Sequence, residues 1–185
     1  MQVCVLASGP SMCQSDAARV SDWRNGTNRL AIAVNNTFLL MPIVDAIFAT
    51  DRRWWGRYYP QAKATGAQLW CQTPKLSDQL NINATEWTSD SGNSGERALR
   101  LAAEGFQATR IILIGFDMED SAQKHWHGPH PKGWPNPEPS HFVLWRNWIG
   151  RLVATHPNID WVNASRQTAL ECIPRIDLET ALCLS

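Results

Sequence analysis

The chain has 185 residues, with 17 Lys and Arg against 17 Asp and Glu, and 44% of its residues are hydrophobic. This length suits one domain over residues 1–185 with a core of ordinary size. The formal net charge of zero argues against a protein that holds nucleic acid by bulk electrostatics. No apolar run approaches the roughly 18 residues that a membrane-spanning helix needs, so we expect no membrane contact.

The first residues, 1–7, form an apolar run without a preceding basic segment, and we interpret it as a buried strand rather than a signal peptide. The five cysteines are scattered and show no CxxC spacing. Without a secretory leader, this usage favours free thiols in a reducing compartment. We therefore expect a cytoplasmic protein.

Short β-branched, apolar runs alternate with amphipathic segments along the chain, which is typical of βαβ units and a mainly parallel sheet. The predicted strands are 2–7, 30–34, 46–50, 68–71, 110–114 and 159–162. The predicted helices are 15–22, 51–59, 95–105, 140–155 and 177–183. The sequence thus predicts a single-domain, doubly wound α/β fold of Rossmann-like type.

One long irregular segment, 119–139, is rich in histidine, proline and glycine. A loop of this length in a compact domain is usually functional or disordered. Its aromatic and imidazole side chains argue against plain disorder, so we expect an active-site loop.

Small and polar residues follow five of the predicted strands. In an open parallel sheet, ligands bind outside the carboxyl ends of the strands, near the point where the strand order reverses. Loops are polar in any protein, so one such turn would decide little, but five together predict a shared binding site. The turns are Ser8-Gly9-Pro10-Ser11, Asn35-Asn36-Thr37, Asp51-Arg52-Arg53, Gly115-Phe116-Asp117 and Asn163-Ala164-Ser165.

Two glycine-containing turns lead into predicted helices. In the turn 8–11, free N–H groups and the following helix dipole would suit a phosphate, although a simple tight turn explains the same residues. The turn Ser91-Gly92-Asn93-Ser94-Gly95 offers hydroxyls and N–H groups to an anion or a ribose, with an ordinary helix cap as the alternative. Neither turn is a GxGxxG or a Walker A motif.

Two aspartates carry alternative interpretations. Asp117 could accept a hydrogen bond from a sugar hydroxyl or a base, hold a divalent cation, or only cap the turn that follows it. Asp51 opens the run Asp51-Arg52-Arg53-Trp54-Trp55, which could bind phosphate or stack a base. The alternative for this run is an amphipathic helix with tryptophan in the core and arginine in solvent.

The run His125-Trp126-His127-Gly128-Pro129-His130 places three imidazoles within six residues. Histidine is the natural general base near neutral pH and also the commonest metal ligand. The spacing H-x-H-x-x-H could bind zinc, yet no cysteine or carboxylate lies close by to complete a tetrahedral set. The three interpretations are a general base, a metal ligand and solvated loop histidines. We favour the general base and assign no metal ligand.

Five motifs occur in an order that resembles known families: LASGPSM, IAVNNTF, SGNSGERALRLAAEGFQATRIILIGFDM, HWHGPHP and VNASRQTAL. Over nearly the whole chain they resemble small phage-encoded proteins called morphogenetic (often misspelt norphogenetic) proteins. More distantly they are similar to bacterial CMP-sialic-acid sialyltransferases of glycosyltransferase family 42. They are also similar to the motility-accessory-factor family and to archaeal-type 6-hydroxymethylpterin diphosphokinases.

The resemblance to the sialyltransferases implies a set of nucleotide contacts and a general base. The first turn and the asparagine turn would hold the CMP portion of the donor, and the Asn163 turn would lie near the donor phosphate or base. The histidine loop would supply the base as His127 or His130, with His125 and His141 as further candidates. With the strand-end residues, the predicted nucleotide-binding set is Ser8, Gly9, Pro10, Ser11, Asn35, Asn36, Asp51, Ser94, Gly95, Asp117 and Asn163.

The predicted function is group transfer from a nucleotide-activated donor, most simply glycosyl transfer from a nucleotide sugar such as a CMP-linked one. The acceptor hydroxyl could belong to a modified phage DNA base, a glycan or a small metabolite, and a second copy of the chain is a further candidate partner. A phage-encoded chain would act in the host cytoplasm. One alternative is Mg²⁺-dependent diphosphoryl transfer from a nucleoside triphosphate, with the ion on Asp117 and Asp51. The other is a nucleotide-binding or virion-assembly protein without turnover.

Overall fold

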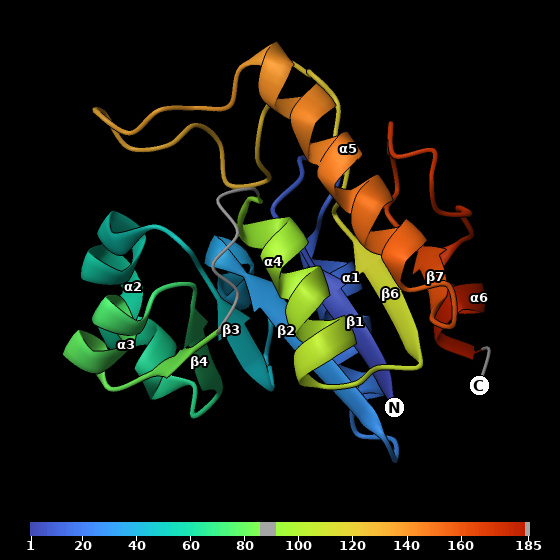
Figure 1. Ribbon diagram of the computed structural model, residues 1–185, viewed down its shortest axis with the longest axis horizontal. Helices are drawn as coiled ribbons and strands as arrows, with labels where there is room; N and C mark the ends of the chain where they lie inside the picture. Colours follow the sequence, from blue (N-terminus) through green and yellow to red (C-terminus); the bar gives the residue numbers. More distant parts are fainter. Residues whose placement is uncertain (86–91, 184–185) are drawn as a thin grey trace.

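The computed structural model describes residues 1–85 and 92–183 and contains a seven-stranded sheet in which all paired strands are parallel. The order across the sheet is β5-β4-β3-β2-β1-β6-β7 (Figure 1). The strands are β1 (Gln2–Leu6), β2 (Arg29–Val34), β3 (Ala46–Phe48), β4 (Gln68–Cys71), β5 (Asn83–Ala84), β6 (Arg110–Ile114) and β7 (Asp160–Asn163).

The strand order reverses beside β1, an interior strand of the sheet. From β1 the chain adds β2, β3, β4 and β5 to one side, then crosses back and adds β6 and β7 to the other. Leu6 at the end of β1 pairs with Ala33 of β2 on one side and Ile114 of β6 on the other. The switch point therefore lies between β1 and β6, where ligands bind in folds of this class.

Helices cover both faces of the sheet, as the predicted doubly wound fold requires. They are α1 (Gln14–Trp23), α2 (Arg52–Ala64), α3 (Pro74–Leu80), α4 (Ser94–Arg100), α5 (Pro139–Thr155) and α6 (Leu178–Cys183). Buried residues of α1, α2, α3 and α6 share one core with Cys4 and Leu6 of β1, and those of α4 and α5 share the other with Val3 and Val5. Because successive strand residues point to opposite faces, the continuously apolar strands serve two cores.

No helix among the residues described here is both long and apolar enough to span a lipid bilayer. The six predicted strands are confirmed, each with bounds within two residues of the prediction. The short elements α3, β5 and the 3₁₀ helix η1 (Asn35–Leu40) were not predicted. Helix α2 also continues beyond the predicted end and includes Pro60. The helix continues because it buries Trp54 and Trp55 before the proline and Ala62 after it.

The predicted helix 95–105 is divided in two. Its last turn is the π-helical segment η2 (Leu101–Gly105), where the Phe106 N–H donates to the carbonyl oxygen of Leu101 at 2.8 Å. This hydrogen bond spans five residues rather than four. Such π turns are rare and usually occur as single turns attached to α-helices.

The long loop before α5 contains no helix or strand, as predicted. Figure 1 shows it extending from the start of α5 toward the side of the molecule that carries α2. The Arg53 guanidinium of α2 lies 5.5 Å from the ring centre of Trp134 in this loop. The loop therefore reaches across the carboxyl edge of the sheet.

Candidate functional site

A cleft of about 330 Å³ lies outside the carboxyl ends of the central strands, between the sheet and the long loop. A smaller recess of about 100 Å³ adjoins it and shares several of its residues. Of the residues predicted from the sequence, the cleft is lined by Ser8, Gly9, Pro10, Asn35, Ser94, Gly95, Asp117, His125, His130 and His141. The recess adds Asn36, Asp51 and His127.

The turn after β1 is fastened to the end of β6. The Gly9 N–H donates to the Gly115 carbonyl oxygen at 2.9 Å. Ser11 donates twice to the Asp117 carboxylate, from its N–H and from its hydroxyl, each at 2.8 Å. A Cβ on Gly9 would lie 2.2 Å from Asp117 Oδ1 and 2.4 Å from the Gly115 oxygen. Glycine is therefore required here for the close approach of two chain segments.

These contacts correct one expectation. The N–H groups of Gly9 and Ser11 are bonded inside the protein, and that of Met12 donates to the Gly9 carbonyl at 3.1 Å. They are not free for a phosphate, so that part of the prediction is wrong. The pattern of residue types could not reveal this for Gly9 and Ser11, because their partners, the Gly115 carbonyl and the Asp117 carboxylate, lie more than 100 residues away along the chain.

The Asp117 carboxyl forms a buried, polar part of the cleft wall. Its exposed fraction is 2%, and burial raises its pKa above the ordinary value, opposed by the hydrogen bonds from Ser11. The nearby charge of Glu119 also raises the pKa. The Asp117 carboxylate therefore fastens the turn 8–11, rather than the turn that follows Asp117 as one alternative held, and it also lines the cleft.

The start of α4 is tied to the end of β3. The Ser94 hydroxyl accepts from the Thr50 N–H at 3.2 Å and shares a hydrogen bond with the Thr50 hydroxyl at 2.9 Å. Asn93 caps the helix by accepting from the Glu96 N–H at 2.8 Å. Ser91, the first residue of the predicted turn, lies outside the described residues. This connection holds Ser94 at the cleft.

The two residues of the asparagine turn have different contacts. Asn35 adopts a left-handed backbone (φ 50°), which asparagine tolerates, and lines both cavities. Asn36 accepts from the Trp54 indole N–H at 2.6 Å and donates to the Tyr58 hydroxyl at 3.3 Å. Its amide thus joins η1 to α2.

The run that begins at Asp51 forms the start of an amphipathic helix, as its alternative interpretation held. Asp51 caps α2 by accepting from the Arg53 N–H at 2.7 Å. Trp55 is fully buried, and Arg53 is exposed. Asp51 lines the recess and Asp117 lines the cleft, so the two proposed Mg²⁺ ligands do not share a cavity.

Asn163 does not reach the cleft. It is fully buried, accepts from the Ser165 N–H at 3.0 Å and donates to the Thr168 hydroxyl at 3.1 Å. The end of β7 lies beyond β6, one strand further from the switch point. Asn163 therefore stabilises its own loop, and the Ser165 hydroxyl joins that loop to the end of β6 by accepting from the Phe116 N–H at 2.8 Å.

The three imidazoles of the long loop stack on one another. The ring centres of His125 and His130 are 4.5 Å apart and those of His125 and His127 are 5.0 Å apart, with ring planes 12–13° from parallel. His130 Nδ1 lies 2.8 Å from the Pro135 carbonyl oxygen. Because a carbonyl only accepts, Nδ1 carries the proton, and Nε2 of the neutral ring is left as an acceptor.

For His125 and His127, a lowered pKa favours the neutral form. Burial, followed by the charges of His130 and His127, lowers the pKa of His125 to about 4. Burial also lowers the pKa of His127. The Ser8 backbone opposes the lowering of the His125 pKa. No hydrogen bond of normal geometry reaches the buried His125 Nε2 from the described residues.

Phe142, Trp145 and Lys124 are among the cleft-lining residues that the sequence analysis missed, whereas His141 beside the first two was predicted. His141 was a candidate base, but its Nδ1 accepts from the Glu138 N–H at 2.9 Å as part of the α5 cap. Phe142 and Trp145 follow it on α5 and form an apolar wall of the cleft. Lys124 is also in the wall and pairs with Asp120. The available signal was the amphipathic start of α5, which places residues 141, 142 and 145 on neighbouring positions of one helix face.

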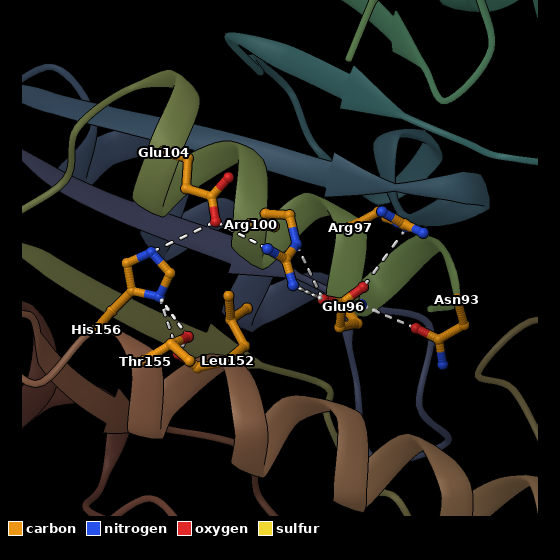
Figure 2. A network of polar contacts seen from close by, with 8 residues as sticks. All are labelled: Asn93, Glu96, Arg97, Arg100, Glu104, Leu152, Thr155 and His156. Carbon is orange, nitrogen blue, oxygen red and sulfur yellow. Dashed lines mark hydrogen bonds and ion pairs between the residues drawn. The ribbon is translucent and has the colours of Figure 1, made fainter. Parts of the chain in front are cut away.

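A chain of ion pairs fixes α4 behind the cleft (Figure 2). Arg100 contacts Glu96 at 3.2 Å and Glu104 at 2.8 Å, and Glu104 lies 3.4 Å from Nε2 of His156 at the end of α5. Glu96 also lies 3.7 Å from the fully buried Arg97. Burial raises the pKa of Glu96, against the opposing charges of the two arginines. The network connects the helices on this face of the sheet.

Comparison of the chain with protein-family models, curated proteins and solved structures finds no match. The function is therefore inferred from the sequence motifs and the geometry of the cleft.

Proposed function

We propose that the chain binds a nucleotide-linked donor in the cleft and transfers the activated group, most simply a sugar, to a hydroxyl acceptor. The observation that carries the proposal is the meeting, at the switch point, of polar strand ends with a histidine-rich loop. The order of the sequence motifs, which resembles that of nucleotide-sugar transferases, supports the same chemistry.

The cleft wall suits a ligand that combines hydroxyl groups with a flat ring. Asp117 and Asn35 offer oxygen acceptors to sugar hydroxyls, and Phe142 and Trp145 offer an apolar surface for a base. The Lys124 ammonium is a cationic group for a donor phosphate. In this assignment the turn 8–11 positions Asp117, and its own N–H groups do not hold the phosphate.

His130 is the proposed general base of the metal-free protein. With the proton on Nδ1 directed to Pro135, Nε2 can accept the proton of the acceptor hydroxyl. The hydroxyl oxygen then bonds to the anomeric carbon, while the bond from that carbon to the donor phosphate breaks and the nucleotide leaves with the electron pair. His127, in the adjoining recess, is the second candidate for this step.

Binding is tested by thermal melting with nucleotides and nucleotide sugars, cytidine derivatives included. A ligand at ten times its Kd stabilises the native state by about 1.4 kcal/mol. The Asn35→Ala variant should lose this stabilisation, and Asn147→Ala, an exposed residue of α5 outside the cleft, should keep it. If no ligand at millimolar concentration raises the melting temperature, the proposed function is wrong.

Turnover is tested separately with the donor that binds. His130→Ala should lower kcat roughly 10²–10⁴-fold and leave donor binding nearly unchanged. Full activity of both His130→Ala and His127→Ala would eliminate a histidine base.

A further inference from the structure

The histidine stack has a feature that a base alone does not explain. One ring nitrogen from each of His125, His127 and His130 can be chosen so that all three lie within 4.8 Å of one another. In His125, no hydrogen bond of normal geometry reaches the buried Nε2 from the described part of the chain, and in His130 Nε2 is the nitrogen left unprotonated by the contact with Pro135. Buried polar atoms in proteins are nearly always paired, and an unpaired one calls for a ligand or another explanation.

We propose that His125, His127 and His130 together bind one divalent transition-metal ion, with zinc the ion that fits best. Neutral imidazole is a preferred ligand of zinc, and three protein ligands leave a fourth position for water or substrate. Within the ranges 1–85 and 92–183, no carboxylate or thiol joins this group. The site would therefore be of the open kind, and it replaces the sequence-based prediction of no metal.

The surroundings of the cluster resemble those of bound metals in two respects. Histidines that bind metals usually donate their second ring N–H to a carbonyl or carboxylate, as His130 does to Pro135. The loop is also anchored to the sheet, because the Trp126 N–H donates to the Ser8 carbonyl oxygen at 3.2 Å. The His130 N–H donates to Asn136 Oδ1 at 2.9 Å and closes the loop on itself.

Binding requires a rearrangement of the rings. The lone pair of an imidazole nitrogen lies in the ring plane, so stacked rings within 13° of parallel cannot all point at one ion. The rings must therefore rotate about their side-chain torsions. This rotation breaks the stacking contacts and allows metal–nitrogen bonds to form. Gly128, between the second and third histidines, has a left-handed backbone and open space around it.

The inference goes beyond the proposed function and alters one step of it. His125 and His130 line both the cleft and the recess, so the open position of the ion would be available to a ligand in either. In the loaded protein the ion would occupy His130 Nε2 and lower the pKa of the acceptor hydroxyl as a Lewis acid, so that the hydroxyl proton passes to solvent water. His130 accepts that proton directly only in the metal-free protein.

The first experiment measures metal binding by untagged, chelator-stripped protein at pH 7.5. Titration with Co²⁺ should give a visible absorption band that saturates at one ion per chain and disappears when Zn²⁺ is added. Each of His125→Ala, His127→Ala and His130→Ala should weaken binding at least about 100-fold, the upper end of the effect of losing a supporting partner. The matched controls are His141→Ala and His156→Ala, which replace the remaining two of the five histidines and should keep full binding.

A second measurement needs no variant. Zn²⁺ should protect residues 125, 127 and 130 of the wild-type chain from modification by diethyl pyrocarbonate, and leave 141 and 156 reactive. Absence of a stoichiometric ion, or equal effects at all five histidines, would overturn the inference. Nucleotide binding without metal binding overturns this inference alone, and metal binding without nucleotide binding overturns the proposed function alone.

Discussion

At Gly9 the backbone passes so close to Asp117 that no side chain fits between them. Gly9→Ala must push the carboxylate away from Ser11, and we expect the free energy of unfolding to fall by about 1–3 kcal/mol, as for other overpacked sites. Gly56→Ala is the matched control. It lies inside α2 with open space around it, so alanine should raise stability by up to about 1 kcal/mol. Urea denaturation of the two variants measures both effects, and a neutral Gly9→Ala would contradict the close approach.

The buried carboxyl of Asp117 makes a second prediction, for the dependence of stability on pH. Its folded pKa is raised, so the folded state binds the proton more tightly than the unfolded state does. This contribution to stability is present below the unfolded pKa and is lost as pH rises through the folded pKa. Asp117→Asn cannot ionise, so its stability relative to the wild type should improve as pH rises from about 3.5 to 7.

Urea denaturation of the wild type and Asp117→Asn at four or five pH values isolates this group, because every other titrating group is common to both chains. Parallel stability curves would show that the carboxyl ionises equally easily in the folded and unfolded states.

At the residue scale, the sequence brought several of the candidate residues to one edge of the sheet, for an identifiable reason. Ser8, Asn35 and Asp117 follow strands that lie side by side in the sheet, and the ends of neighbouring parallel strands share one edge. Asn163 also follows a strand, but residue patterns do not give the strand order, and β7 lies away from the switch point. The stacking of the histidines depends on tertiary contacts and could not be predicted from their spacing.

At the scale of elements, an ion-pair network runs along α4 into η2 and reaches the end of α5 through the contact of Glu104 with His156. Glu96 is almost fully buried beside Arg97 and Arg100. Glu96→Ala removes the carboxylate that pairs with these two guanidiniums, and we expect the free energy of unfolding to fall by about 3 kcal/mol. Glu104 is more than a quarter exposed, and its pairs are screened by water. Glu104→Ala should therefore lower the free energy of unfolding by less than about 1 kcal/mol. Similar losses for the two variants in thermal or urea denaturation would mean that burial does not control the strength of this network.

The elements that the sequence predicted are those with large buried apolar faces. Every residue of β6 is buried, and its run of isoleucine and leucine clearly indicates a buried strand. By contrast, β5 has two residues and no buried one, and only Leu76 of α3 is buried. The combination of Thr73 with Pro74 was an available signal for α3, because proline is favoured at the first position of a helix.

At the scale of the whole molecule, the position of a strand in the sheet should determine how long its amide hydrogens stay protected. Strands β1, β2 and β6 are flanked by strands on both sides and covered by helices on both faces. We expect the slowest hydrogen exchange there and the fastest in β5 at the edge. Exchange followed by mass spectrometry tests this ranking, and equal protection at the centre and the edge would contradict it.

The strand order also has a consequence for synthesis on the ribosome. Strand β1 can pair with β2 once residue 34 has emerged, but its second neighbour, β6, is complete only at residue 114. At roughly 5–20 residues per second, these 80 residues take about 4–16 seconds. During that interval β1, an interior strand of the finished sheet, is an open edge, which can pair with another chain. Nascent chains on one messenger are therefore exposed to co-translational association, until the segment that carries Asp117 covers the edge and completes the cleft.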